Sequence, residues 1–252
     1  MKNSLFLVCF FLLVRVVLCA QSDAIPIGMV VYSHQVHLST DNENNGFATL
    51  FFNATNSLYV HNSAPPADSV VQEDDYSSKF IKGDAEGFPI YKSHASRQAF
   101  SKIPCFLSPN HCLVSDTLGD VQWTLEPERK RLAIYECRRA TGTFRGRQYE
   151  AWYAVDIPVS SGPYKFAGLP GLILEVRTLD GKVEFLFQKL EFSPDWPAII
   201  QPPHGKETGW TFKEYIEARN ENGERIEKEF RAKGVDITVT VNPDSLEIFD
   251  KQ

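Results

Sequence analysis

Apolar and polar side chains alternate along much of this chain, which is the pattern of β-strands with one buried face. In residues 29–38, Val30 and Tyr32 fall on one face while Ser33 and Gln35 fall on the other. Further short runs with strand character follow at residues 121–125, 131–138, 148–157 and 235–241. The sequence therefore predicts a mainly β fold.

Two hairpins are predicted where turn residues separate such runs. Asn53-Ala54-Thr55-Asn56 divides the strands expected within residues 47–60. Asp180-Gly181 divides those expected within residues 172–192, and this pair favours a type I′ turn, in which both residues adopt positive φ. Residues 193–209 are rich in Pro and Gly and are predicted to form an irregular crossing.

One helix is predicted near the C-terminus, at about residues 211–233. Thr211 and Glu214 have the spacing of a capping box, in which each side chain satisfies a backbone N–H at the helix start. Gly223 is expected to break the helix in two, and Gly234 to end it. With the strands, this predicts one curved antiparallel sheet or open barrel with a C-terminal helix packed on it.

Residues 1–20 have the pattern of a cleavable signal peptide. A basic start precedes an apolar run at residues 5–18, and Ala20 supplies a small residue at the cut. The run is shorter than the roughly 20 residues that a membrane-spanning helix needs. A lipid anchor on Cys19 is disfavoured because a large residue precedes it. We therefore expect export by this signal and one strand-rich domain over residues 21–252.

The chain is acidic, with a formal net charge of −6 at pH 7. Its acidic residues are scattered, which is typical of a solvated surface. Such a surface has no general attraction for nucleic acid or anionic lipid. We therefore expect no nucleic-acid partner, and the sequence beyond the signal peptide predicts no transmembrane span.

Three cysteines follow the signal peptide, namely Cys105, Cys112 and Cys137. Export leads to an oxidising compartment, where disulfides form. The segment between Cys105 and Cys112 is short and turn-rich enough to close, which would leave Cys137 as a buried thiol. The alternatives are that Cys137 pairs with one of the other two, or that it is reactive or binds a metal.

The densest group of motifs lies at residues 137–176. Within it, Leu169-Pro170-Gly171-Leu172 predicts a type II turn, because Pro170 fixes φ and Gly171 supplies the positive φ of the third position. Ser161-Gly162-Pro163 predicts a second turn. The two turns are expected to gather the aromatic side chains of Trp152, Tyr153, Tyr164 and Phe166.

Gly168-Leu169-Pro170-Gly171-Leu172-Ile173 is also the hexapeptide that names a family. With the flanking motifs at residues 144–147, 151–153 and 162–166, the segment 137–176 resembles the GLPGLI family. The resemblance implies an exported protein of the Bacteroidota envelope and implies no activity. It also points to an accessory role beside an outer-membrane, TonB-dependent receptor.

The residue types of the hexapeptide are explained by its backbone alone. Gly168, Pro170 and Gly171 are interpreted as structural turn residues, because the glycines do not follow the spacing of a phosphate-binding loop. Gly171→Val is expected to destabilise the fold, since a β-branched residue resists positive φ.

Five residues of the segment are candidates for binding a ligand, namely Arg145, Arg147, Trp152, Tyr164 and Lys165. Paired arginines suit a carboxylate or a phosphate, and aromatic faces stack on sugars or peptide side chains. The alternative is a structural role, in which the arginines pair with acids such as Glu150 and Asp156 and the aromatic residues belong to the core.

The sequence shows no motif for metal binding or catalysis. His34 and His37 are three residues apart in a predicted strand and therefore face opposite sides of it. No other spacing of histidines or cysteines indicates a metal site, and no Gly-x-Ser-x-Gly motif is present. The sequence therefore predicts a non-enzymatic protein with no metal site and no cofactor.

Three functional hypotheses follow. The first is an envelope protein, in the periplasm or at the outer membrane, that binds a TonB-dependent receptor or its cargo. The second is a periplasmic carrier of a small ligand or metal ion, with a cavity lined by Trp152 and Tyr164 and with Arg145 and Arg147 at its entrance. The third is a hydrolase whose site is not visible in the sequence.

Overall fold

The computed structural model describes residues 27–39, 42–61, 88–106, 111–118, 121–193 and 200–237. The predicted signal peptide lies outside the described residues. The predicted last strand lies mostly outside them too, and its described part, residues 235–237, is not in a strand.

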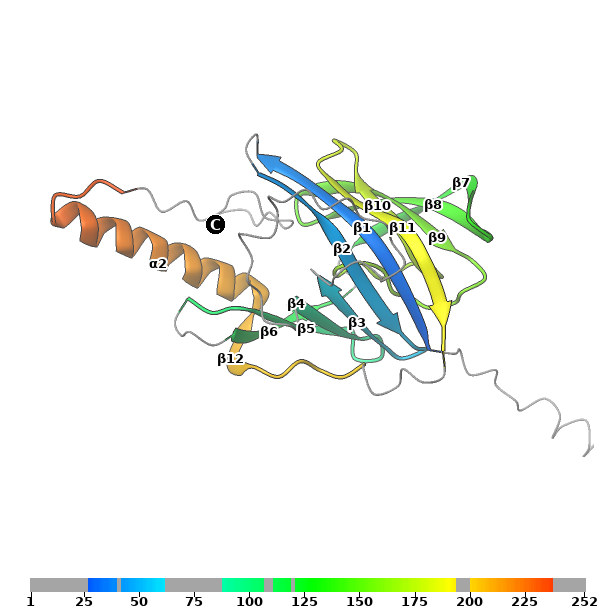
Figure 1. The fold of residues 1–252 in the computed structure, drawn as a ribbon, viewed down its shortest axis with the longest axis horizontal. Coiled ribbons are helices and arrows are strands. Elements are labelled where there is room, and N and C mark those ends of the chain that lie inside the picture. The colour runs from blue at the N-terminus through cyan, green and yellow to red at the C-terminus, as the bar shows by residue number, and fades with distance from the viewer. Residues whose placement is uncertain are drawn as a thin grey trace, which may run out of the picture.

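Twelve strands form one open sheet in the described part of the chain. The first six are β1 (Gly28–Ser39), β2 (Asn42–Phe52), β3 (Asn56–His61), β4 (Phe88–Ser93), β5 (Gln98–Pro104) and β6 (His111–Thr117). The others are β7 (Gln122–Leu132), β8 (Tyr135–Phe144), β9 (Arg147–Ala154), β10 (Leu172–Thr178), β11 (Val183–Phe192) and β12 (Lys206–Thr211). Their order is β12-β6-β5-β4-β3-β2-β1-β11-β10-β9-β8-β7, so β12 and β7 are the edges. The predicted mainly β fold with a curved open sheet is confirmed (Figure 1).

The sheet is antiparallel at every pairing described except one, since β12 runs parallel to β6. The predicted curved antiparallel sheet therefore has one parallel pairing, at this edge. The irregular crossing predicted over residues 193–209 is too long, because its last residues belong to β12. A long connection sets no hairpin geometry, so the chain can return to the edge in either direction.

Both predicted hairpins are present, and side chains close their loops. In the β2–β3 loop, the Asn53 side chain accepts hydrogen bonds from the backbone N–H groups of Thr55 (2.9 Å) and Asn56 (2.8 Å). In the β10–β11 loop, only Gly181 has a positive φ, of 70°. The type I′ prediction is wrong because the loop is longer than two residues, and the Thr178 hydroxyl accepts a hydrogen bond (3.0 Å) from the N–H of Val183.

The single strand predicted at residues 131–138 is two strands. The chain reverses between β7 and β8 at Ala133, which has a φ of 50°, and Ile134, which is 80% exposed. Neither residue is a typical turn former. The alternation of side chains continues on both sides of this short turn, so the sequence pattern did not reveal it.

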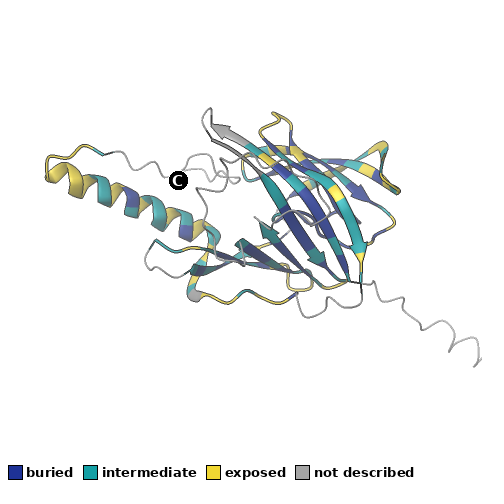
Figure 2. Cartoon of the chain, in the orientation of Figure 1, coloured by how far each residue is buried: buried dark blue, intermediate teal, exposed yellow. Residues whose placement is uncertain are grey.

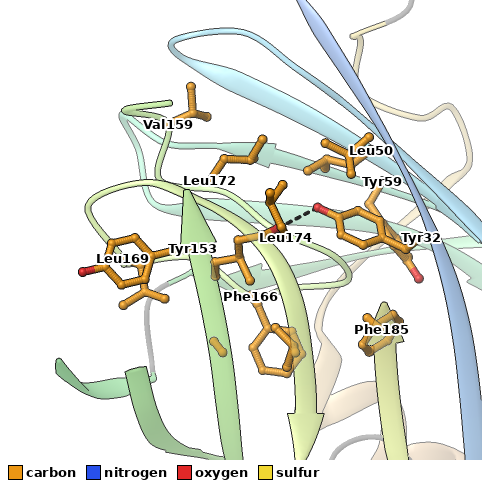
Figure 3. Packing of buried hydrophobic residues seen from close by; sticks show 14 of the residues in the cluster. Tyr32, Leu50, Tyr59, Tyr153, Val159, Phe166, Leu169, Leu172, Leu174 and Phe185 are labelled. Atoms are coloured by element: carbon orange, nitrogen blue, oxygen red, sulfur yellow. Dashed lines mark hydrogen bonds between the residues drawn. The ribbon is translucent and has the colours of Figure 1, made fainter. Parts of the chain in front are cut away.

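The core lies on the concave side of the sheet. Here residues 155–171, called the connector below, join β9 to β10 and pack against side chains from both halves of the sheet. Dark blue positions in Figure 2 mark the buried side chains of the strands. Figure 3 shows side chains of β1, β2, β3, β10, β11 and the connector converging, with the Tyr32 hydroxyl donating to the carbonyl oxygen of Ile173 at 2.7 Å. Each large apolar side chain buried in this way contributes about 1.5–3 kcal/mol.

The helix α2 (Phe212–Ala232) follows β12 directly and extends beyond that edge of the sheet (Figure 1). Its predicted capping box is confirmed, with hydrogen bonds in both directions between Thr211 and Glu214. The predicted break is wrong, because the helix continues through Gly223, which is buried. Gly234 follows the last turn at a φ of 75° and donates to the carbonyl oxygen of Arg231.

The sequence predicted no transmembrane span beyond the signal peptide, and the helix α2 was compared with what such a span requires. Within residues 27–237, apart from the gaps named above, no helix combines the length and the apolar composition that crossing a bilayer requires.

Candidate functional site

A cavity of about 300 Å³ opens on the concave side of the sheet. Its lining residues come from β1, β3, β4, β5, β11, the connector and the first residue of α2. These elements are distant in sequence, and the cavity exists only because the connector folds back over the sheet. A volume of this size suits a small organic molecule.

Aromatic rings form most of one wall of the cavity. Tyr59 on β3 lies edge-to-face against Tyr164 of the connector, with ring centroids 6.5 Å apart, and against Phe185 on β11 at 6.4 Å. Phe212, at the start of α2, lines the cavity as well. Rings held in this way offer a flat apolar ligand both faces and edges to contact.

Two histidines line the cavity next to this wall. His34 on β1 is 1% exposed, and its ring centroid lies 4.3 Å from that of His61 on β3. Burial, together with the nearby His34 ring, lowers the pKa of His61 to about 3. A pKa this low keeps the His61 ring neutral at physiological pH, so it offers one hydrogen-bond donor and one acceptor.

This histidine pair was not predicted from the sequence, although the alternation of β1 indicated that His34 is buried. His34 has the same parity as Val30 and Tyr32, so it had to face the core with them. His61 could not be paired with it from the sequence, because β2 separates their strands in the sheet. Among the described residues, no group of three His, Cys, Asp or Glu side chains is placed to hold a metal ion.

A cluster of charged side chains adjoins the cavity at Lys165, which lines it. The Lys165 ammonium lies 2.7 Å from Oδ2 of Asp116 and 3.3 Å from the centre of the Phe212 ring. Arg145 donates to Oδ1 of Asp116 at 2.6 Å. Burial raises the pKa of the Asp116 carboxyl, but the adjacent Lys165 and Arg145 outweigh it and hold this pKa below its ordinary value. The carboxylate is therefore ionised and anchors both cations.

The structure brings together some of the predicted ligand-binding residues and separates others. Tyr164 and Lys165 line the cavity. Arg145 contacts Asp116, which in turn pairs with Lys165 of the cavity lining. Arg145 lies in the β8–β9 turn with a φ of 45°, and Arg147 is the first residue of β9. Neither arginine lines the cavity.

Trp152 does not line the cavity, because the alternation of β9 turns it to the face opposite Ala151 and Tyr153. Its indole N–H donates to Glu150 at 3.0 Å, and the Lys130 ammonium lies 4.4 Å from its ring centre. Glu150 also accepts from Arg139 and Arg177. Glu150 therefore pairs with arginines of neighbouring strands. The structural alternative had paired it with Arg145 or Arg147, and the structure does not show the pairing with Arg145.

The type II turn predicted at Leu169-Pro170-Gly171-Leu172 also differs from the structure. The positive φ belongs to Gly168, at 97°, and not to Gly171. Gly171 is required for another reason, since a Cβ there would lie 2.2 Å from the carbonyl oxygen of Ala154. The turn predicted at Ser161 lies slightly later, where the Phe166 N–H donates to the carbonyl oxygen of Pro163 (3.1 Å) and Tyr164 has a φ of 49°.

The predicted disulfide between Cys105 and Cys112 is confirmed, and it joins the end of β5 to the start of β6 with their Cα atoms 4.9 Å apart. Cys137 is a free, buried thiol. Burial raises its pKa to about 11, so the thiolate that would react or bind metal is scarce at neutral pH.

A second buried polar cluster ties the connector to β3 and β4, away from the cavity. The Ser57 hydroxyl lies 2.9 Å from that of Ser161 and 3.3 Å from Nε2 of His94. Lys92 is fully buried and donates to the carbonyl oxygen of Gly162. Its pKa is lowered to about 7 by burial.

Lys92 is expected to make stability rise with pH between 7 and 8.5. The pKa of Lys92 in the folded protein lies below its ordinary value of 10.5, so between pH 7 and 8.5 the Lys92 side chain holds its proton more tightly in the unfolded chain than in the folded protein. Raising the pH across this range therefore increases the free energy of unfolding by about 1.5 kcal/mol. Urea denaturation across this range should show the rise in the wild-type protein and a much flatter profile in Lys92→Met. The exposed Lys213→Met variant is the control, and a wild-type slope in Lys92→Met would contradict the explanation.

Comparisons with known proteins now identify what the chain is similar to. Residues 143–175 match the family described as "Protein of unknown function (Porph_ging)". The match lies within residues 137–176, which hold the densest group of motifs, and it contains the hexapeptide at residues 168–173. No curated protein matches.

Two solved structures of PNGF-II are similar to this chain. The one in the C2 space group aligns with a TM-score of 0.51 and 14% identity over 76% of this chain, and the one in the P21 space group with 0.49 and 14% over 73%. This chain spans about a third of each PNGF-II chain, at 32%. At such identity, the similarity to the first concerns the fold alone.

Proposed function

We propose that this protein binds a small, largely apolar molecule in the cavity between the connector and the sheet. The observation that carries the proposal is a cavity of ligand size walled by aromatic rings from separate elements. Concave apolar sites with a few polar groups are the usual form of small-molecule sites. This proposal is the small-ligand form of the carrier hypothesis. Tyr164 lines the cavity as that hypothesis expected, while Tyr59 and Phe185 line it in the place expected for Trp152.

The setting of this function is part of the proposal. The signal-peptide pattern of residues 1–20 supports export, and the disulfide between Cys105 and Cys112 suits an oxidising compartment. The hexapeptide supports assignment to the GLPGLI family and, through it, to a periplasmic or outer-membrane location. The accessory role beside a TonB-dependent receptor rests on that resemblance alone and stays a prediction.

Neutral 2-naphthol is a suitable first probe, because it is a flat apolar molecule whose own fluorescence reports its surroundings. Titration of the mature chain, residues 21–252, should give a dissociation constant on the order of 0.1 mM or lower. The Val36→Trp variant, which places an indole in the cavity lining, should lose most of this binding.

Gln35→Trp is the matched control, because it places the same side chain on the exposed, opposite face of β1. It should bind 2-naphthol as the wild-type protein does. Amide chemical shifts give a second measurement that needs no variant, with changes expected in β3, β5 and residues 164–165 and none in β7. A wild-type protein that binds neither 2-naphthol nor any similar neutral aromatic would overturn the proposed function.

A further inference from the structure

Two polar residues of the cavity lining, Ser101 and Lys165, lie near each other. Across β5 and β6, Ser101 pairs with Val114 and Ala99 pairs with Asp116. Ser101 and Asp116 are therefore diagonal neighbours on the concave face, roughly 7–8 Å apart. Asp116 holds the Lys165 ammonium at 2.7 Å, so the Ser101 hydroxyl and the Lys165 ammonium lie at the same end of the cavity.

Ser101 is a buried hydroxyl that the fold does not satisfy. It lines the cavity and is 2% exposed, and its Oγ makes no hydrogen bond to any described residue. A hydroxyl taken out of water without a partner destabilises a protein, and such groups are rare without a functional reason. A ligand atom that accepts a hydrogen bond would supply the missing partner.

Lys165 places a positive charge at this end of the cavity. The described lining residues include no aspartate or glutamate. The Lys165 ammonium keeps its ion pair with Asp116, and its positive charge attracts an anionic ligand atom at this end of the cavity. The Phe212 ring covers another side of the ammonium at 3.3 Å. In so apolar a setting, a hydrogen bond between a cation and an anion is strong.

We propose that the cavity takes a small organic acid, with its apolar body against the aromatic wall and its carboxylate at Ser101 and Lys165. The carboxylate accepts from the Ser101 hydroxyl and from the Lys165 ammonium, which remains paired with Asp116. This inference rests on the proposed function, since it names the class of ligand for the same cavity.

The first measurement compares two ligands that share one apolar body. 2-Naphthoate carries the carboxylate, and its methyl ester carries the same rings without the charge. Isothermal titration of the mature protein should give at least a tenfold tighter dissociation constant for 2-naphthoate than for the ester.

Two variants then test the residues. Ser101→Ala should weaken 2-naphthoate binding about tenfold, and the empty variant should melt at the same temperature as the wild-type protein or higher, because the unsatisfied hydroxyl is gone. Lys165→Met should remove the preference for the acid over the ester. Ser115→Ala is the control, because Ser115 lies on the neighbouring strand, does not line the cavity and donates to the carbonyl oxygen of Trp210.

The outcomes distinguish a failure of this inference alone from a failure of the proposed function. If acid and ester bind equally and Ser101→Ala changes neither affinity, the acid assignment is wrong while the cavity remains a binding site. If the Lys165→Met protein does not fold, the Ser101→Ala comparison still decides the question. If neither ligand binds the wild-type protein, the inference and the proposed function fail together.

Discussion

Gly171→Val is expected to lower the free energy of unfolding by about 3 kcal/mol, the upper end of the usual range for overpacking. A Cβ at this position would lie 2.2 Å from the carbonyl oxygen of Ala154 and 3.0 Å from its carbonyl carbon. These are backbone atoms of β9, which is paired with strands on both sides and cannot move away easily. Urea denaturation at pH 7 measures the loss. The direction agrees with the expectation from the sequence, but the cause is steric and not a positive φ.

Two further substitutions distinguish these causes. Gly171→Ala should lose nearly as much stability as Gly171→Val, because the Cβ alone makes the close contact. Gly181→Ala isolates the backbone effect, since Gly181 has a φ of 70° and open space around it, and it should cost about 1 kcal/mol. A Gly171→Ala protein no less stable than Gly181→Ala would show that the steric explanation is wrong.

Acid is expected to destabilise the protein well before its carboxylates titrate. Burial lowers the pKa of His61 to about 3, with a contribution from His34, and that of His94 to about 4, with a contribution from Lys92. Both lie below the ordinary value of 6.5, so the unfolded chain takes up protons first as the pH falls. The stability that depends on these neutral rings is complete above pH 6.5 and is lost toward pH 4. Each ring should account for about 2.5 kcal/mol between pH 8 and pH 4.5.

Denaturant titrations at pH 8, 6, 5 and 4.5 measure this loss. His61→Phe keeps an aromatic ring in the cavity lining and cannot take up a proton, so it should remove about half of the pH dependence. His204→Gln changes an exposed histidine of the β11–β12 connection and should leave the dependence as it is. Equal slopes in the wild-type and His61→Phe proteins would contradict a buried neutral His61.

Several elements could be predicted from the sequence because their signals are local. The β2–β3 hairpin forms around the Asn53 side chain, which bonds residues two and three positions later. The start of α2 depends on Thr211 and Glu214, which are also three residues apart. The same reasoning accounts for the pairing of Cys105 and Cys112 across a short loop.

The predictions of the fold were wrong where the local sequence pattern is compatible with more than one structure. A period of two continues through the turn at Ala133, so one strand was predicted in place of two. Gly223 has a low helix propensity, but the helix continues through it, because tertiary context outweighs propensity. Pro170 and Gly171 have the composition of a type II turn, while the structure needs Gly171 for its contact with Ala154.

The residues of the candidate site were predicted only in part. There is a physical reason why some of them were found from the sequence and others were not. Tyr164 and Lys165 were found because they belong to the dense connector sequence, and both line the cavity. Trp152 was misplaced because the parity of β9 turns it to the face opposite Tyr149 and Tyr153, which are buried in the core. His61 and Ser101 carried no sequence signal, since their role depends on strands distant in the chain.

The sequence by itself determined the strand-rich composition, the hairpins, the helix start and the disulfide of this protein, because each depends on residues a few positions apart. Only the tertiary structure decided which side chains meet in the cavity. That choice depends on the order of twelve strands in the sheet and on the path of the connector across its concave face. Both follow from the burial of apolar surface by the whole chain, which no single segment specifies.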